Sequence, residues 1–201
     1  MALLNYTDLQ SAMSNWLDQT LFSARYPDLI TLFEAYANRR LRVRQMETST
    51  TLVPSSGSVA LPTDYLSWRR VTDVGAVLRE LEYVHPSYIK AAYPSAPSAP
   101  PSVFTIEGST LKIMPTDSTA IDFSYFQKIP ALSASNADNW LLLAHPDAYL
   151  FGALAEAELF GVNDQRAALW ASRKDEIMGE IERLSNKTRG VGPIKIMGVT
   201  P

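Results

Sequence analysis

The sequence predicts an α+β fold: a helical bundle formed by N- and C-terminal helices, with an inserted antiparallel β-sheet region and an extended C-terminal arm. Apolar residues recur at helical spacing near both ends of the chain, whereas polar and apolar residues alternate in its middle. A length of 201 residues favours one domain with a smaller appendage. We therefore expect bundle helices over 1–46 and 131–189, the β-rich insertion over 47–130, and the arm over 190–201.

Two amphipathic helices are predicted before residue 46. The first covers 6–20, and Thr7 and Gln10 at its start have the spacing of a capping box. The second begins at Pro27, a residue that suits the first turn of a helix. Each helix needs a neighbour to cover its apolar face. The two faces are Leu9, Met13, Trp16 and Leu17 in the first helix, and Ile30, Phe33, Ala37 and Leu41 in the second, widened by Leu29, Leu32 and Tyr36.

The middle of the chain is predicted to form strands joined by turns. The Thr-rich segment 48–53, the turn 54–57 and the segment 59–61 predict a hairpin. A second hairpin is predicted around Gly108, between 103–107 and 111–114. The other predicted elements are strands over 68–74, 77–84 and 120–126, a short helix over 86–92, and a stiff polyproline-like spacer over 95–101.

Helical periodicity returns in the last third of the chain. The segment 148–160 is apolar almost all round, which predicts a central helix buried on most sides. A last helix is predicted over 164–186. Its apolar stripe has heptad spacing and consists of Trp170, Ile177 and Leu184, with Ile181 beside them.

Composition limits the classes of function. The formal net charge is −3, from 18 Lys and Arg against 21 Asp and Glu, which disfavours a strongly basic nucleic-acid binder. Hydrophobic residues make up 46% of the chain, which excludes disorder for most of it. Only 19% of residues are charged, and this shortage indicates association with other proteins. Cysteine is absent, so disulfides, thiolate metal sites and cysteine nucleophiles are excluded.

The common catalytic signatures are also missing from the sequence: it has no phosphate loop, dinucleotide fingerprint, nucleophile elbow or zinc-protease motif. His85 and His145 each precede a proline, which predicts helix cap positions rather than a metal site. Glu156 and Glu158 lie on the most apolar helix, where carboxylates can act as acids, so a hydrolase is a third hypothesis. However, residues two apart face different sides of a helix and cannot form one acid–base pair. A salt bridge to an arginine or a subunit contact is favoured. We expect no enzymatic activity and no cofactor or metal.

No segment has the length and apolar character of a membrane span, and the first residues lack a signal-peptide pattern. The sequence therefore predicts a soluble, unexported protein without a membrane partner.

Four arginines lie within seven residues: Arg39, Arg40, Arg42 and Arg44, seconded by Arg69 and Arg70. Guanidinium groups bind phosphate, so this cluster is a candidate DNA-binding surface. Arginines at a helix C-terminus also complement the helix dipole and pair with carboxylates of the same or a neighbouring chain. Because the net charge is negative and stacking aromatics are not interleaved, pairing is favoured and a DNA-binding module is the alternative.

The last residues form an apolar arm that carries one charge, Lys195. Disordered tails are usually polar, so this composition predicts docking. Extended segments of this kind add to a sheet edge or fill a groove on a partner. The other interpretation is an arm lying along its own domain, and we favour the partner. The candidate contact residues are Ile194, Ile196, Met197 and Val199.

Several segments in a characteristic order carry a family resemblance. They are 5–9 (Asn5-Tyr6-Thr7-Asp8-Leu9), 33–47, 61–66, 139–147 and 154–157. Together they resemble the head–tail adaptor proteins of tailed bacteriophages, especially short-tailed ones, from Asn5 to about Arg173. The spacer 95–101 and the arm lie outside the resemblance.

The resemblance implies a structural protein of the virion, made in the host bacterial cytoplasm and located at the head–tail junction. It implies a homo-oligomeric, dodecameric ring that binds beneath the portal protein after genome packaging. Such a ring extends the channel through which genomic DNA passes without sequence-specific binding, and it attaches tail nozzle or fibre proteins. The family pattern contains no catalytic residues.

Overall fold

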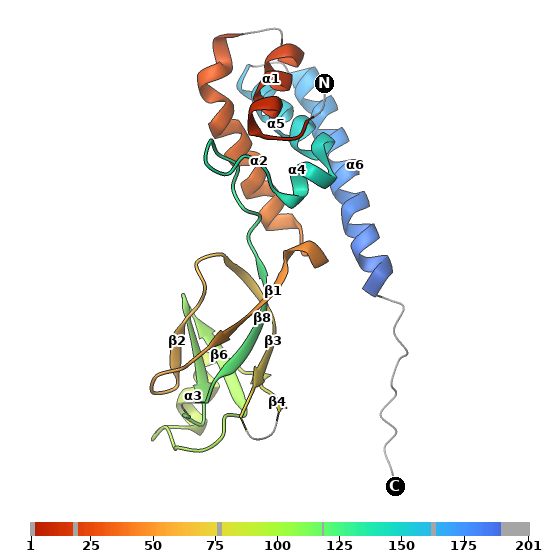
Figure 1. Cartoon of the computed structure of the whole chain (residues 1–201). Helices are drawn as coiled ribbons and strands as arrows, with labels where there is room; N and C mark the ends of the chain where they lie inside the picture. Colours follow the sequence, from red (N-terminus) through yellow and green to blue (C-terminus); the bar gives the residue numbers. More distant parts are fainter. Residues whose placement is uncertain (1–2, 18–19, 76–77, 118, 162–163, 190–201) are drawn as a thin grey trace. The chain divides into compact units, whose positions relative to one another are not determined.

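The computed structural model describes residues 3–17, 20–75, 78–117, 119–161 and 164–189 of the chain. They belong to two compact units (Figure 1). The helical unit is drawn from Met1–Gln45 and Ile129–Pro201, and the β unit is Met46–Lys128. Helices of the first unit and sheets of the second confirm the predicted α+β class.

The helical unit is organised around α5, which contacts α1, α2, α4 and α6 (Figure 1). Because α5 is apolar on nearly every side, this confirms its predicted central place. None of the helices in the described ranges is long and apolar enough to cross a membrane. The helices are α1 (Tyr6–Leu17), α2 (Tyr26–Arg40), α4 (Trp140–Ala144), α5 (Pro146–Phe160) and α6 (Asp164–Arg189), with 3₁₀ turns at Thr20–Arg25 and Arg44–Met46.

The N-terminus of α1 is capped by Asn5, so the predicted box of Thr7 and Gln10 is wrong. The Asp8 amide donates to Asn5 Oδ1 at 2.9 Å, and Asn5 Nδ2 donates back to Asp8 Oδ2 at 2.9 Å. The first of these bonds satisfies one free backbone amide of the first turn, and the helix starts at Tyr6. The described helix is Tyr6–Leu17, the predicted residues 18–19 lie outside the described ranges, and a 3₁₀ helix begins at Thr20.

The two histidines occupy the cap positions that the following prolines predict. His85 precedes α3 (Pro86–Ala92), and its Nδ1 accepts from the Ser87 amide at 3.3 Å. His145 precedes α5 and makes no side-chain cap bond. Asn139, which the sequence did not single out, caps α4 by accepting from the Leu142 amide at 2.9 Å.

The buried side of α6 differs from the predicted stripe. Ile181 is buried, as the predicted stripe requires, whereas Leu184 is 61% exposed and Met178, outside the stripe, is buried. The buried positions Ala167, Lys174 and Ser185 continue this second line. At about 100° per residue, the buried positions centre roughly 70° around the helix from the heptad of large apolar residues. Leu32 on α2 and Trp16 on α1 are likewise exposed rather than buried.

The β unit contains two four-stranded sheets, ordered β1-β8-β3-β4 and β2-β7-β6-β5. Their apolar sides share one core, built around Val71, Phe104, Ile113 and Phe123. The pairing is antiparallel apart from the short β5–β6 pair, which is parallel. The strands are β1 (Glu47–Leu52), β2 (Ser58–Ala60), β3 (Tyr65–Asp73), β4 (Arg79–Glu80), β5 (Glu82–Tyr83), β6 (Val103–Glu107), β7 (Thr110–Met114) and β8 (Ile121–Gln127).

The first predicted hairpin is correct as a turn and wrong as a strand pair. Ser55 and Ser58 exchange two backbone hydrogen bonds, of 2.9 and 3.0 Å, around Ser56 and Gly57, which have φ of 50° and 74°. However, β1 pairs with β8 and β2 pairs with β7. The turn therefore takes the chain from one sheet to the other, because each strand covers a different half of the shared core.

Of three other predictions for the β unit, one is confirmed and two are wrong. The hairpin around Gly108 is confirmed as β6 and β7. The predicted strand 77–84 is broken into β4 and β5, which belong to different sheets, and residues 76–77 lie outside the described ranges. The spacer 95–101 is not a continuous polyproline helix, since Ala96 has φ 43° and Ser98 forms a bridge with Thr116.

Candidate interaction surface

The arginine cluster lies at and just beyond the C-terminus of α2, and Arg40 holds that end against α6. Arg40 Nε lies 3.0 Å from Glu182 Oε1, and its Nη1 lies 3.1 Å from Asp175 Oδ1. Nη1 also donates to the Tyr36 hydroxyl at 2.6 Å, and this hydroxyl donates to Asp175 at 2.5 Å. Burial and the neighbouring Asp175 raise the pKa of Tyr36. We call this group the Arg40 clasp.

Lys174 completes the clasp, because its Nζ contacts Tyr36 and lies 4.0 Å from Asp175 Oδ1. Its Nζ lies 3.9 Å from the centroid of the Tyr36 ring, and its side chain is largely buried. A cation over an aromatic face is attracted by the ring quadrupole. The clasp thus supports the predicted pairing of cluster arginines with carboxylates, here within one chain.

The other three arginines have different surroundings. Arg42 is half-buried, and its Nη1 donates to the backbone carbonyls of Asn38 and Leu41, which closes the end of α2. Burial lowers the pKa of Arg42. Arg39 and Arg44 are exposed, and within the described part of the chain neither guanidinium forms an ion pair or hydrogen bond. Two of the four arginines are therefore structural and two face solvent.

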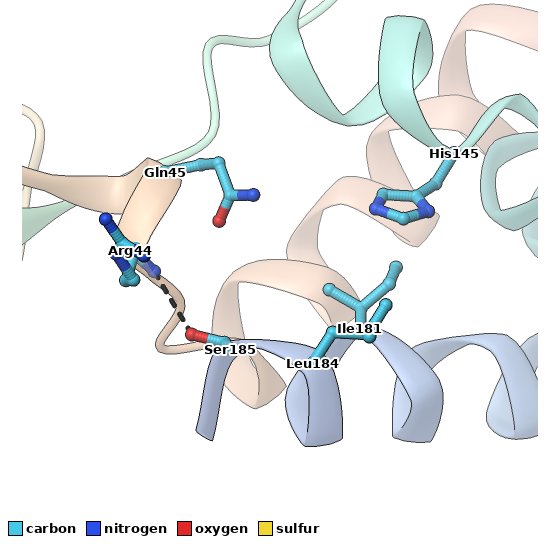
Figure 2. Close-up of a pocket in the computed structure, with 6 residues that line it drawn as sticks. All are labelled: Arg44, Gln45, His145, Ile181, Leu184 and Ser185. Carbon is cyan, nitrogen blue, oxygen red and sulfur yellow. Dashed lines mark hydrogen bonds between the residues drawn. The ribbon is translucent and has the colours of Figure 1, made fainter. Parts of the chain in front are cut away.

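A groove of about 500 Å³ adjoins Arg44 (Figure 2). Figure 2 shows Arg44 and Gln45 across from His145, with Ile181 and Leu184 of α6 between them. The backbone amide of Arg44 donates to Ser185 Oγ at 3.3 Å, which holds this segment on α6. A polar rim around an apolar floor suits a docked segment. Sequence reasoning missed this groove because its lining comes from three separate segments.

The two glutamates considered for catalysis have separate environments. Glu158 is buried, and its Oε1 lies 3.0 Å from Arg166 Nε, an ion-pair contact whose angle is poor for a hydrogen bond. This confirms the favoured salt bridge to an arginine. Glu156 is half-buried beside an apolar groove of about 340 Å³ that also includes Leu159 and Lys174.

A buried polar network around Glu34 was not predicted. Glu34 Oε1 accepts from the Leu132 amide at 2.8 Å and from the Tyr149 hydroxyl at 3.1 Å. Asn139 Nδ2 donates to the same hydroxyl at 2.6 Å and to the Pro130 carbonyl at 2.7 Å. Burial raises the pKa of Glu34 despite these donors. One sequence signal existed: Glu34 follows Phe33 on the apolar face of its helix.

The predicted arm residues Ile194, Ile196, Met197 and Val199 lie outside the described residues. The structure therefore places the arginine cluster and leaves the arm as a prediction.

Comparison with known proteins agrees with the resemblance found in the sequence. A family model described as SU10 adaptor protein matches residues 4–195. No curated protein matches the chain. Because the family model spans nearly the whole sequence, including both units, the chain belongs to the SU10 adaptor protein family.

Proposed function

We propose that this protein is a structural head–tail adaptor of a tailed bacteriophage. It assembles as a dodecameric ring beneath the portal protein, extends the DNA channel and attaches tail nozzle or fibre proteins. The observation that carries this proposal is the family match over residues 4–195. The protein would be made in the bacterial cytoplasm and act in the virion at the head–tail junction.

The surface of the helical unit supports an assembling protein. Large apolar side chains are more than half exposed on four of its helices, where they leave apolar surface in contact with water. Repeated subunit contacts bury side chains of this kind. They are Leu32 on α2, Leu143 on α4, Leu159 and Phe160 on α5, and Leu169 and Leu184 on α6.

The environments of Glu156 and Glu158, the two hydrolase candidates, favour a non-enzymatic role. Glu158 is buried and paired with Arg166. A buried carboxylate held in this way stabilises its surroundings and is not available to a substrate. Glu156 is half-buried and two positions away on another side of the helix, so the two carboxylates do not form one acid–base pair.

The arginine cluster also favours the adaptor over the DNA-binding alternative. Arg40 and Arg42 are held by groups of their own chain, and only Arg39 and Arg44 face solvent. Genomic DNA would pass through the channel without sequence-specific contacts. A DNA-binding module would instead bind free duplex with an affinity that falls steeply with salt.

A phage with an amber mutation in this gene tests the proposal. We expect DNA-filled heads without tails in a non-suppressing host. Adding the purified protein to those heads should restore tail attachment, and electron cryomicroscopy should show a ring at the portal vertex. Wild-type heads that already carry tails serve as the control. Normally tailed mutant particles, or virions that lack the protein, would overturn the proposal.

A further inference from the structure

An aromatic groove lies between α1, α5 and α6 of the helical unit. Its volume is about 500 Å³. Three rings line it: the Trp16 centroid is 5.4 Å from Trp170 and 6.0 Å from Phe151, and Phe151 stacks on Trp170 at 5.5 Å. Trp16 is 46% exposed, so part of its indole surface is open to a partner.

The same groove carries excess negative charge. Its lining includes the carboxylates of Asp147, Glu176 and Glu180 and the guanidinium of Arg173. Arg173 Nη1 lies 3.2 Å from Glu176 Oε2, so that pair is neutral. Asp147 accepts only from the Ala148 amide, at 3.0 Å, and Glu180 is exposed without an ion pair among the described residues. Within the described ranges, Asp147 and Glu180 therefore have no cationic partner.

A groove that combines tryptophan rings with carboxylates favours the binding of a planar cation. A guanidinium stacks on tryptophan through cation–π attraction and donates two parallel hydrogen bonds to a carboxylate. The groove is thus suited to an arginine side chain, more than to an ammonium group, which is compact and strongly hydrated.

The chain itself has exposed arginines outside this groove, Arg39 at the end of α2 and Arg44 just beyond it. Asp175 and Glu182, which hold Arg40, lie on the side of α6 that faces α2. Glu176 and Glu180 lie roughly 100° or more around the same helix. The solvent-facing Arg39 at the end of α2 and the acidic groove are therefore separate surfaces of one unit, with opposite charge.

We propose that the aromatic groove of one subunit receives Arg39 of a second copy of this chain, with Arg44 beside its rim. This contact joins two different surfaces, so it is heterologous, and repeated heterologous contacts close into a ring when the rotation allows. The inference rests on the proposed function and deepens it, because it assigns the two surfaces that meet at each subunit contact.

Charge reversal on DNA-filled, tailless heads tests the contact. Glu180→Arg places two cations at every contact, and Arg39→Glu places carboxylates against carboxylates. We expect each single variant to lower the number of subunits bound per head by about tenfold, because like charges at an interface are strongly unfavourable. The double variant restores opposite charges and should recover wild-type binding. Arg79→Glu, an exposed reversal in the β unit, is the matched control and should bind normally.

Mixing the two defective single variants provides a second, independent measurement. If the two variants alternate, the groove of the Glu180→Arg subunit meets the glutamate of the Arg39→Glu subunit, and the unchanged Glu180 groove meets an unchanged Arg39. Every contact then has opposite charges, so the mixture should assemble although neither variant does alone. This rescue excludes misfolding as the cause of the single defects.

The outcomes separate this contact from the proposed function. Normal assembly of the single variants would overturn the contact. So would failure of both the double variant and the mixture to restore binding. That failure is the result expected if the groove instead binds an arginine of another virion protein. Failure of the wild-type protein itself to bind heads overturns the proposed function and the contact with it.

Discussion

At the scale of single residues, Glu34 has the most consequential environment. It is a buried carboxylate whose pKa is raised by desolvation, although the Leu132 amide and the Tyr149 hydroxyl donate to it. The network joins α2 to the segment before α4 and to α5. A charge is buried here because it satisfies a backbone amide that packing would otherwise leave without an acceptor.

Replacing Glu34 should change how stability depends on pH. The folded pKa is raised, so the folded protein holds the proton more tightly than the unfolded chain, and stability falls as pH rises from the ordinary value of 4.5 through the raised one. Glu34→Gln removes this titration. We expect the stability of Glu34→Gln relative to wild type to increase with pH over that window, measured by thermal unfolding at a series of pH values.

A second Glu34 variant separates charge from hydrogen bonding. Glu34→Ala leaves the Leu132 amide and the Tyr149 hydroxyl without their acceptor and should be less stable than Glu34→Gln by about 2–3 kcal/mol at any pH, because neither variant titrates at this position. Glu82→Gln, at an exposed strand position, is the control and should follow the wild-type pH profile. If Glu34→Gln kept the wild-type profile, a raised pKa for Glu34 would be contradicted.

At the scale of elements, close approach of α2 and α5 depends on Gly152. A Cβ atom at this position would overlap the Phe33 ring. Phe33 in turn packs edge-on against Tyr149, at 5.0 Å between ring centroids. The Phe33 ring of α2 therefore packs directly on the backbone of α5. Any residue other than glycine at position 152 would force the ring to move.

Gly152→Ala should destabilise the helical unit by about 1–3 kcal/mol through overpacking, measured by denaturant unfolding. Gly179→Ala in α6 is the matched control, because a Cβ there meets only Arg40 Nη2, at 3.9 Å. The control should be neutral or stabilising by up to about 1 kcal/mol, since alanine favours helix. Equal effects of the two substitutions would show that helix propensity, and not the Phe33 contact, decides the outcome.

At the scale of the whole molecule, fold and assembly should be separable. The core of the helical unit is built from side chains of α1, α2, α4, α5 and α6, and that of the β unit from its two sheets. The apolar arm follows all of these elements in the sequence. Its composition predicts a role in association, with the portal protein or a neighbouring subunit as the docking surface.

Truncation after Arg189 tests this role of the arm. We expect an unchanged unfolding temperature and about tenfold weaker binding to tailless heads, a loss of about 1.4 kcal/mol. Binding is measured by sedimentation of labelled protein with the heads. Substituting only Ile194, Ile196, Met197 and Val199 by serine should reproduce the loss if apolar contacts carry it. If the truncated protein and the serine variant both bound heads as tightly as wild type, the arm would have no role in association.

The sequence alone determined most elements of secondary structure. Helical and strand periods are local properties, and so are the prolines that place His85 and His145 at helix starts. The apolar character of 148–160 was enough to identify the central helix, because a helix without a polar face has to be covered on all sides. The resemblance to phage adaptors also came from short segments in order, and the family match confirmed it.

Only the tertiary structure decided which segments meet. β1 pairs with β8 rather than with its neighbour β2, and the buried side of α6 includes Met178 and Ser185 rather than Leu184. Glu34 found its partners about a hundred residues away in the chain. Periodicity describes one segment at a time, whereas strand pairing, helix rotation and buried polar contacts depend on the free energy of packing segments that are distant in sequence.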